Sequence, residues 1–171
     1  MSSFMTPSST EMWLTSWATR QFGSGVGAST AAVMATYGKL IIRRKYEQLS
    51  TVPFVLSVIN YDEAQRVLQE WTNLLSTAQN LYDSLTAARK TPFFEMVLHP
   101  VLAGKTVQEI YIKAALNALY ARQHRTSTNT LASQVVAAFA ADSSITARYH
   151  SLANGKWDHV MDQVHIGYTT W

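Results

Sequence analysis

The sequence predicts an all-α protein: an antiparallel bundle of about five to six helices with an aromatic-rich C-terminal tail. Apolar residues recur at steps of three and four along most of the chain, which is the period of an amphipathic helix. Only the stretch 50–59 sets a proline among β-branched residues, and it is expected to be an extended connection. No repeat and no low-complexity linker interrupts the pattern, so residues 1–171 are expected to form a single domain.

Two helices are expected in the first 45 residues. Thr10 can cap the first helix and Gly23 can end it in a left-handed conformation, which leaves residues 1–9 as an expected disordered segment. The second helix is expected from about Ser29, with cations at 43–45 that suit its C-terminal dipole. The apolar stripes of the two helices are Trp13, Leu14, Trp17 and Ala18, and Val33, Met34, Tyr37, Leu40 and Ile41.

The strongest periodic signal begins at Tyr61 and predicts one long helix. Its apolar positions are Ala64, Val67, Leu68, Trp71, Leu74, Leu75, Ala78, Leu81, Tyr82 and Leu85. Thr91 followed by Pro92 predicts the start of the next helix, because proline is favoured at the first helical position. Pro100 predicts a bend in that helix, since it cannot donate to the carbonyl of Met96.

The last part of the chain is expected to hold two short helices after a polar turn at 123–129. Thr128 or Asn129 can start the first of them, and Asp142 can cap the second, which Asn154 and Gly155 would close. The tail 156–171 follows and is expected to point toward a neighbouring domain.

Composition excludes several classes of function. Fourteen Lys and Arg against eleven Asp and Glu, spread along the chain, do not make the basic patch that nucleic-acid binding requires. There is no run of 18 apolar residues, so no membrane span is expected, and the N-terminus does not have the form of a signal peptide. With no cysteine, no Gly-rich phosphate loop and no paired metal motif, no cofactor is expected.

The tail concentrates the residues that could carry chemistry. Asp158 and Asp162 would share one face of a helix, whereas glycoside hydrolysis needs two carboxyl groups that flank a bond, so a structural role is preferred and no catalytic residue is assigned. His159, Asp162 and His165 offer zinc ligands at three-residue steps, but this spacing matches no known metal motif, and no metal site is assigned.

Aromatic residues of the tail could form a flat apolar surface. Trp157, Tyr168 and Trp171 could stack on a sugar ring, although packing against another domain is the preferred interpretation. The candidates for a domain interface or the rim of a substrate cleft are Lys156, Trp157, His159, Asp162, His165, Tyr168 and Trp171.

The tail also carries a family resemblance. Residues 156–171, KWDHVMDQVHIGYTTW, resemble a signature stretch of glycoside hydrolase family 115, the xylan α-1,2-glucuronidases, most closely its fungal members. The resemblance extends upstream through WATRQFG at 17–23, RRK at 43–45, INYDEA at 59–64, FFEMVLHP at 93–100 and LYARQHR at 119–125. The tail departs from the family pattern at Val160 and Val164, where Met and Thr are expected.

The resemblance implies a helical domain that follows a catalytic barrel and precedes a β-sandwich in a larger, exported enzyme. That enzyme would remove glucuronic or 4-O-methylglucuronic acid from xylan, with its acid and base residues on the preceding domains. The chain alone is therefore expected to be an inactive segment whose partners are those domains. Two alternatives stay open: a free-standing helical module for self-association or partner binding, and a small carbohydrate-binding domain.

Overall fold

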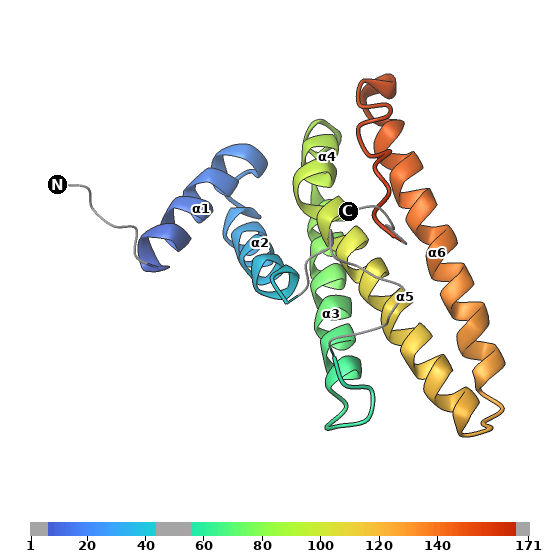
Figure 1. Ribbon diagram of the computed structural model, residues 1–171. Helices are drawn as coiled ribbons and strands as arrows, with labels where there is room; N and C mark the ends of the chain where they lie inside the picture. The colour runs from blue at the N-terminus through green and yellow to red at the C-terminus, as the bar shows by residue number, and fades with distance from the viewer. Residues whose placement is uncertain (1–6, 44–55, 167–171) are drawn as a thin grey trace.

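The computed structural model describes residues 7–43 and 56–166, and within these ranges every regular element is a helix (Figure 1). In chain order the elements are α1 (Pro7–Phe22), α2 (Gly27–Ile41), α3 (Glu63–Ser84), α4 (Ala87–Phe93), the π-helical turn η2 (Phe94–Leu98), α5 (His99–Arg122), α6 (Thr128–His150) and the 3-10 turn η3 (Leu152–Gly155). The predicted all-α bundle is confirmed. In the described ranges, no helix combines the length and apolar character needed to span a bilayer.

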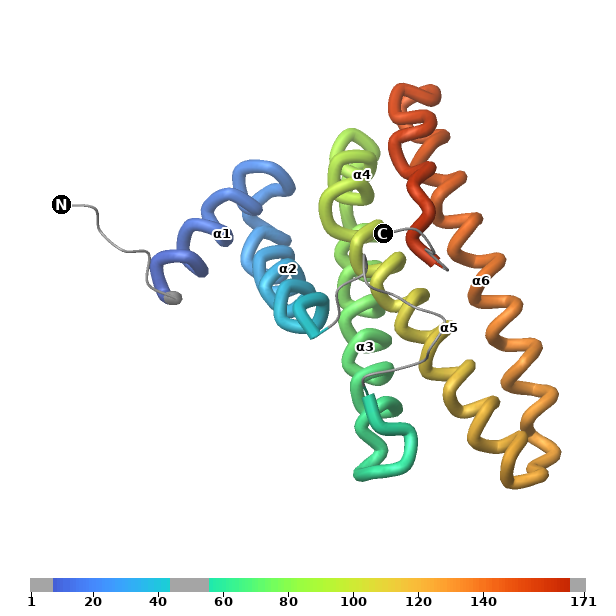
Figure 2. Tube along the Cα trace, viewed as in Figure 1, coloured from blue at the N-terminus to red at the C-terminus, as the bar shows by residue number. Residues whose placement is uncertain are grey.

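Successive long helices run in alternating directions (Figures 1 and 2). The α1–α2 pair lies on one side of α3, and the α5–α6 pair lies on the other. α5 packs on both α3 and α6, whereas α6 makes its main contact with α5 alone. The bundle is therefore layered, with α6 as an outer helix.

The α1–α2 turn depends on two glycines. Gly23 ends α1 at φ +101°, as expected for a left-handed stop. At Gly27, a Cβ would lie 2.1 Å from Oγ1 of Thr19, so only glycine allows the two helices to approach this closely. The predicted cap at Thr10 is wrong, because α1 begins at Pro7 and includes residues 7–9 of the segment expected to be disordered.

The main core surrounds Trp71 on α3. Trp71 is fully buried, and the ring of Tyr37 on α2 meets it edge-to-face with centroids 5.9 Å apart. Phe93, Phe94 and Leu98 are fully buried in the same core, where the ring of Phe93 meets Phe22 of α1 and Tyr82 of α3. The helix predicted from Tyr61 is confirmed, with Ala64, Val67, Trp71, Leu74 and Ala78 on its buried face.

The predicted helix start at Thr91 is wrong. α4 begins at Ala87, so Pro92 lies inside the helix, and α4, η2 and α5 follow one another without a gap. The complete burial of Phe93 and Phe94 outweighs the one backbone hydrogen bond that Pro92 cannot make. The irregularity predicted at Pro100 takes the form of a π-helical turn directly before it, closed by a hydrogen bond from the His99 N–H to the Phe94 carbonyl.

The predicted division of the last segment into two helices is also wrong. α6 runs unbroken through Asp142, because the alanine-rich stretch 137–141 favours a continuous helix over a new start. Asp142 does not cap a helix, and its carboxylate binds His165 instead. The extended connection predicted at 50–59 falls largely outside the described residues, and Arg44 and Lys45 lie outside them too.

Candidate functional site

The candidate site forms where the chain reverses after α6. Ala153, Asn154 and Gly155 all have positive φ, at 50°, 57° and 80°, which turns the chain back on itself. Residues 151–166, hereafter the C-terminal arm, then return along α6 (Figures 1 and 2). Asn154 and Gly155 were predicted to close the last helix, and they do lie at this reversal.

The upper part of the arm is attached to α6 through His150. Nε2 of His150 accepts a hydrogen bond of 3.1 Å from the Met161 N–H, which requires that this nitrogen carry no proton. Nδ1 of His150 lies 3.5 Å from Oδ1 of Asp158, and Nε2 lies 3.6 Å from Oδ1 of Asp162. A proton on Nδ1 can point toward Asp158 while Nε2 accepts from Met161.

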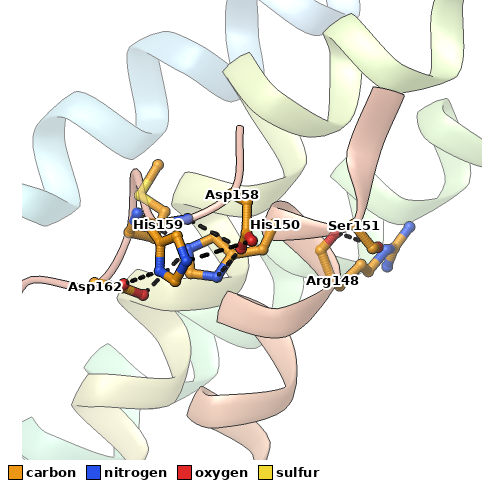
Figure 3. Close-up of polar contacts among 7 residues, drawn as sticks. Arg148, His150, Ser151, Asp158, His159 and Asp162 are labelled. Carbon is orange, nitrogen blue, oxygen red and sulfur yellow. Dashed lines mark hydrogen bonds and ion pairs between the residues drawn. The ribbon is translucent and has the colours of Figure 1, made fainter. Parts of the chain in front are cut away.

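His159 and Asp162 form an exposed pair within the arm. Nδ1 of His159 lies 2.5 Å from Oδ2 of Asp162 (Figure 3). This hydrogen bond, together with the charge of Asp158, raises the pKa of His159 above its usual value. Because the imidazole is largely exposed to solvent, the pair organises the turn of the arm and contributes little to its attachment.

The lower part of the arm is attached to α6 through His165 and Asp142. Nε2 of His165 lies 2.9 Å from each carboxylate oxygen of Asp142, and Nδ1 lies 3.0 Å from the carbonyl of Gln163. Both ring nitrogens therefore face acceptors, which only the doubly protonated imidazolium can satisfy. The hydrogen bond to Asp142 raises the pKa of His165 against the opposing effect of burial.

A fourth histidine, His99, lies near this ion pair. Its ring stacks edge-on against Tyr149 and Phe94, with centroids 4.7 and 5.9 Å away. Burial lowers the pKa of His99 to about 4, and the nearby charge of His165 acts in the same direction while Asp142 opposes it. His99 is therefore neutral at pH 7, whereas the contacts of the neighbouring His165 favour its charged form.

A groove of about 360 Å³ runs between α6 and the arm. Phe139, Ser143 and Thr146 line the α6 side, and residues 161–166 line the other. Asp142 and Asp162, the two carboxylates in its wall, both contact histidines of the same cluster. This arrangement fastens one chain segment to another, and it does not place two unpaired acids on opposite sides of a sugar-sized space.

The predicted site residues of the tail do not form a single site in the structure, because they contact different partners. Asp158 and Asp162 do not share a helical face, because the arm is built from turns, but both approach His150. His159 and His165 bind different carboxylates, and no group of three or more metal-binding side chains occurs among the described residues.

Of the three residues predicted to form a flat aromatic surface, only Trp157 is among the described residues. The ammonium of Lys156 lies 4.7 Å from the centre of a Trp157 ring, which joins two of the candidate residues in a cation–π contact. Tyr168 and Trp171 lie outside the described residues, so the proposed surface stays a prediction.

Three residues of the cluster were missed by sequence reasoning. His99 and His150 are isolated histidines, and no local pattern marks either of them as a site residue. The sequence around Asp142 predicts a helix cap and gives no indication of a histidine partner. Its partner is 23 positions away, and no local pattern reports such a pairing.

Comparison with known proteins finds a similar fold. No model of a protein family matches the sequence, and no curated protein matches it. Among solved structures, the chain is similar to a family GH115 4-O-methyl-α-glucuronidase with specificity for decorated arabinogalactans, with a TM-score of 0.63 and 22% sequence identity. The match covers 89% of this chain and 20% of that chain, so this chain spans about a fifth of the length of that enzyme. The likeness establishes that the helical bundle is a fold found within a much larger glycoside hydrolase.

Proposed function

We propose that this chain is a helical segment of a multidomain α-glucuronidase of glycoside hydrolase family 115, where it supports the catalytic domains and lacks a complete active site of its own. The observation that carries this proposal is the fold similarity, which takes in 89% of this chain but only 20% of the GH115 enzyme. The resemblance of the tail and of five upstream stretches to the same family supports it independently.

The large exposed surface of α6 favours a role as a segment that other domains cover. α6 buries only Ala138 and Asp142 among its 23 residues, and Val136 and Phe139 are 69% and 54% exposed. Exposed apolar side chains on one helix face are typical of a surface that another domain covers. The partners proposed for this face and for the tail are the neighbouring barrel and β-sandwich domains, with Lys156 and Trp157 toward the rim of the cleft.

The substrate proposed for the parent enzyme is a plant polysaccharide that carries glucuronic or 4-O-methylglucuronic acid. The sequence resemblance favours xylan, and the similar solved enzyme is specific for decorated arabinogalactans. Both polymers present a uronic acid on a neutral sugar backbone, which is the shared chemistry. An enzyme acting on such a polymer works outside the cell, so an extracellular location is part of the proposal.

The test is an assay of the purified chain on both polymers. Incubation with glucuronic-acid-decorated xylooligosaccharides and arabinogalactan oligosaccharides is expected to release no uronic acid. Release at a rate that Asp142→Asn or Asp162→Asn abolishes would contradict the proposal, because the active site would then lie in this chain. Sequencing the complete transcript is the second measurement: coding sequence for a barrel upstream and a β-sandwich downstream is expected, and stop codons directly bounding these residues would contradict it.

Sedimentation separates this proposal from a self-associating module. The exposed Val136 and Phe139 are expected to make the purified chain aggregate weakly at high concentration without a defined stoichiometry. A stable dimer that Phe139→Ser converts to monomer would favour the module instead.

A further inference from the structure

The C-terminal arm is attached to α6 by two histidines with opposite proton requirements. His150 must present an unprotonated Nε2 to the Met161 N–H, which donates to it across 3.1 Å. His165 must carry protons on both nitrogens, because Gln163 and Asp142 place acceptor oxygens 3.0 and 2.9 Å from them. At the His165 end, the attachment therefore depends on the state of protonation of the imidazole.

We propose that the C-terminal arm is a pH-dependent clasp, which lies closed along α6 while His165 is doubly protonated and opens when that residue loses a proton. A neutral His165 has one proton for two acceptors. Whichever nitrogen loses it then turns a lone pair toward the carboxylate of Asp142 or the carbonyl of Gln163, and a hydrogen bond becomes a repulsion.

The groups around His165 favour its charged state at neutral pH. Asp142 from α6 is its ion-pair partner, with only 11% of its side-chain surface exposed. His99 from α5 lines a cavity together with His165 and, because its pKa is about 4, adds no competing charge at pH 7. Tyr37 from α2 lines the same cavity, and burial raises the pKa of its phenol, which therefore stays neutral. On the other side, His150 and Asp162 line the groove shared with His165.

Opening the clasp would uncover apolar surface. Ile166, directly after His165, packs against a buried cluster formed by Val107, Ile110, Tyr111 and Ala138 between α5 and α6. The ion pair of His165 with Asp142 therefore holds the apolar contact of Ile166 in place. When the ion pair is lost, water reaches this cluster and the arm loses its protection from hydrogen exchange.

Hydrogen–deuterium exchange of the 171-residue chain between pH 6 and pH 9 tests the clasp. Protection of a peptide covering 157–166 is measured relative to an unstructured synthetic peptide of the same sequence, which corrects for the pH dependence of chemical exchange. Relative protection is expected to fall as pH rises through the raised pKa of His165. The fall should be about tenfold if closing of the arm raises the pKa of His165 by about one.

Three variants distinguish the clasp from a general loss of stability. His165→Gln keeps a donor toward Asp142 but cannot carry a charge, so the pH dependence of arm protection is expected to disappear. Asp142→Asn removes the charged acceptor and is expected to do the same. His159→Gln is the matched control: it makes the same change in the same arm at an imidazole whose carboxylate partner also belongs to the arm, and the pH dependence is expected to remain.

Two results would overturn the proposal. One is a wild-type arm whose relative protection does not change between pH 6 and pH 9. The other is a His165→Gln chain that keeps the wild-type response, which would assign the pH dependence to a different group. Far-UV circular dichroism at each pH confirms that the helices persist, so that opening of the arm is measured and not unfolding of the bundle.

Discussion

Gly104 on α5 lies directly against the indole of Trp71 on α3. A Cβ at position 104 would be 2.4 Å from Cη2 of Trp71 and 2.6 Å from Cζ3, far inside van der Waals contact. The largest side chain of the core and the smallest residue of α5 are therefore matched across the helix interface. This pairing allows α5 to approach α3 closely enough to bury Trp71 completely.

The first prediction concerns this close approach. Gly104→Ala should lower the free energy of unfolding by about 1–3 kcal/mol, because overpacking outweighs the gain of up to about 1 kcal/mol in helix propensity. Urea denaturation followed by circular dichroism measures the effect. Gly38→Ala on α2 is the matched control, since a Cβ there meets nothing within 4 Å, and it should stabilise the protein. Equal midpoints for the two variants would show that α5 and α3 do not meet as described.

The second prediction concerns the indole itself. Trp71→Ala should cost about 3–5 kcal/mol, the usual penalty for truncating a large buried aromatic residue. Trp13→Ala makes the same change on α1 at a side chain that is 55% exposed, and it should alter stability by no more than about 0.5 kcal/mol. Denaturant midpoints of the two variants check the contrast. A comparable loss at Trp13 would place the core elsewhere.

The parts of the fold that could be predicted are those whose cause is local. The apolar residues of α3 repeat at helical spacing over six turns, and the predicted buried face matches Trp71, Leu74 and Ala78. The stop at Gly23 was predictable because a single residue type adopts that conformation readily. In both cases the information lies within a few residues of its effect.

The errors arise where a local signal competes with a distant contact. Thr91 and Pro92 have the pattern of a helix start, yet burial of Phe93 against Phe22, whose ring centroids are 5.1 Å apart, holds them inside α4. Asp142 has the pattern of a cap, yet its partner is His165, which the reversal at Ala153 brings back to it. Asn154 and Gly155 predict that the helix ends there, but alanine gives no indication of positive φ, so the return of the chain along α6 and the ion pair could not be predicted.

The third prediction concerns a contact that joins α4 to the end of α1. Nη1 of Arg89 donates to the carbonyl of Phe22 across 2.9 Å, at the last residue of α1, where helical carbonyls have no partner within the helix. Arg89→Met keeps the length of the side chain but removes the donor, so it should lower stability by about 1 kcal/mol. Arg122→Met, at an exposed position in the last turn of α5, is the control and should be nearly neutral. Thermal unfolding distinguishes the two variants. Equal melting temperatures would show that Arg89 does not stabilise the contact between α1 and α4.

The last prediction concerns the pH dependence of the whole fold, on which His99 and His165 act in opposite directions. The pKa of His99 falls from 6.5 to about 4 on folding, so the unfolded chain binds more protons between these values, and stability is lost as pH falls from about 6.5 toward 4. The pKa of His165 rises above 6.5, so its contribution is complete below pH 6.5 and is lost as pH rises through the folded value.

Both contributions are nearly complete around pH 6.5, and the free energy of unfolding should therefore be greatest there. Urea midpoints between pH 4 and pH 9 measure the profile. His99→Gln should flatten the acid side of the profile alone. His165→Gln should flatten the alkaline side and also lessen the loss of stability on the acid side, because the charge of His165 helps to lower the pKa of His99. The two imidazoles lie near the same carboxylate, so Asp142→Asn should affect both sides of the profile. The loss of stability at alkaline pH should become smaller. The loss at acid pH should become larger, because His99 no longer has the negative charge that favours its protonated form. A profile in which His99→Gln leaves the acid side unchanged would mean that this histidine titrates as freely in the folded bundle as in the unfolded chain.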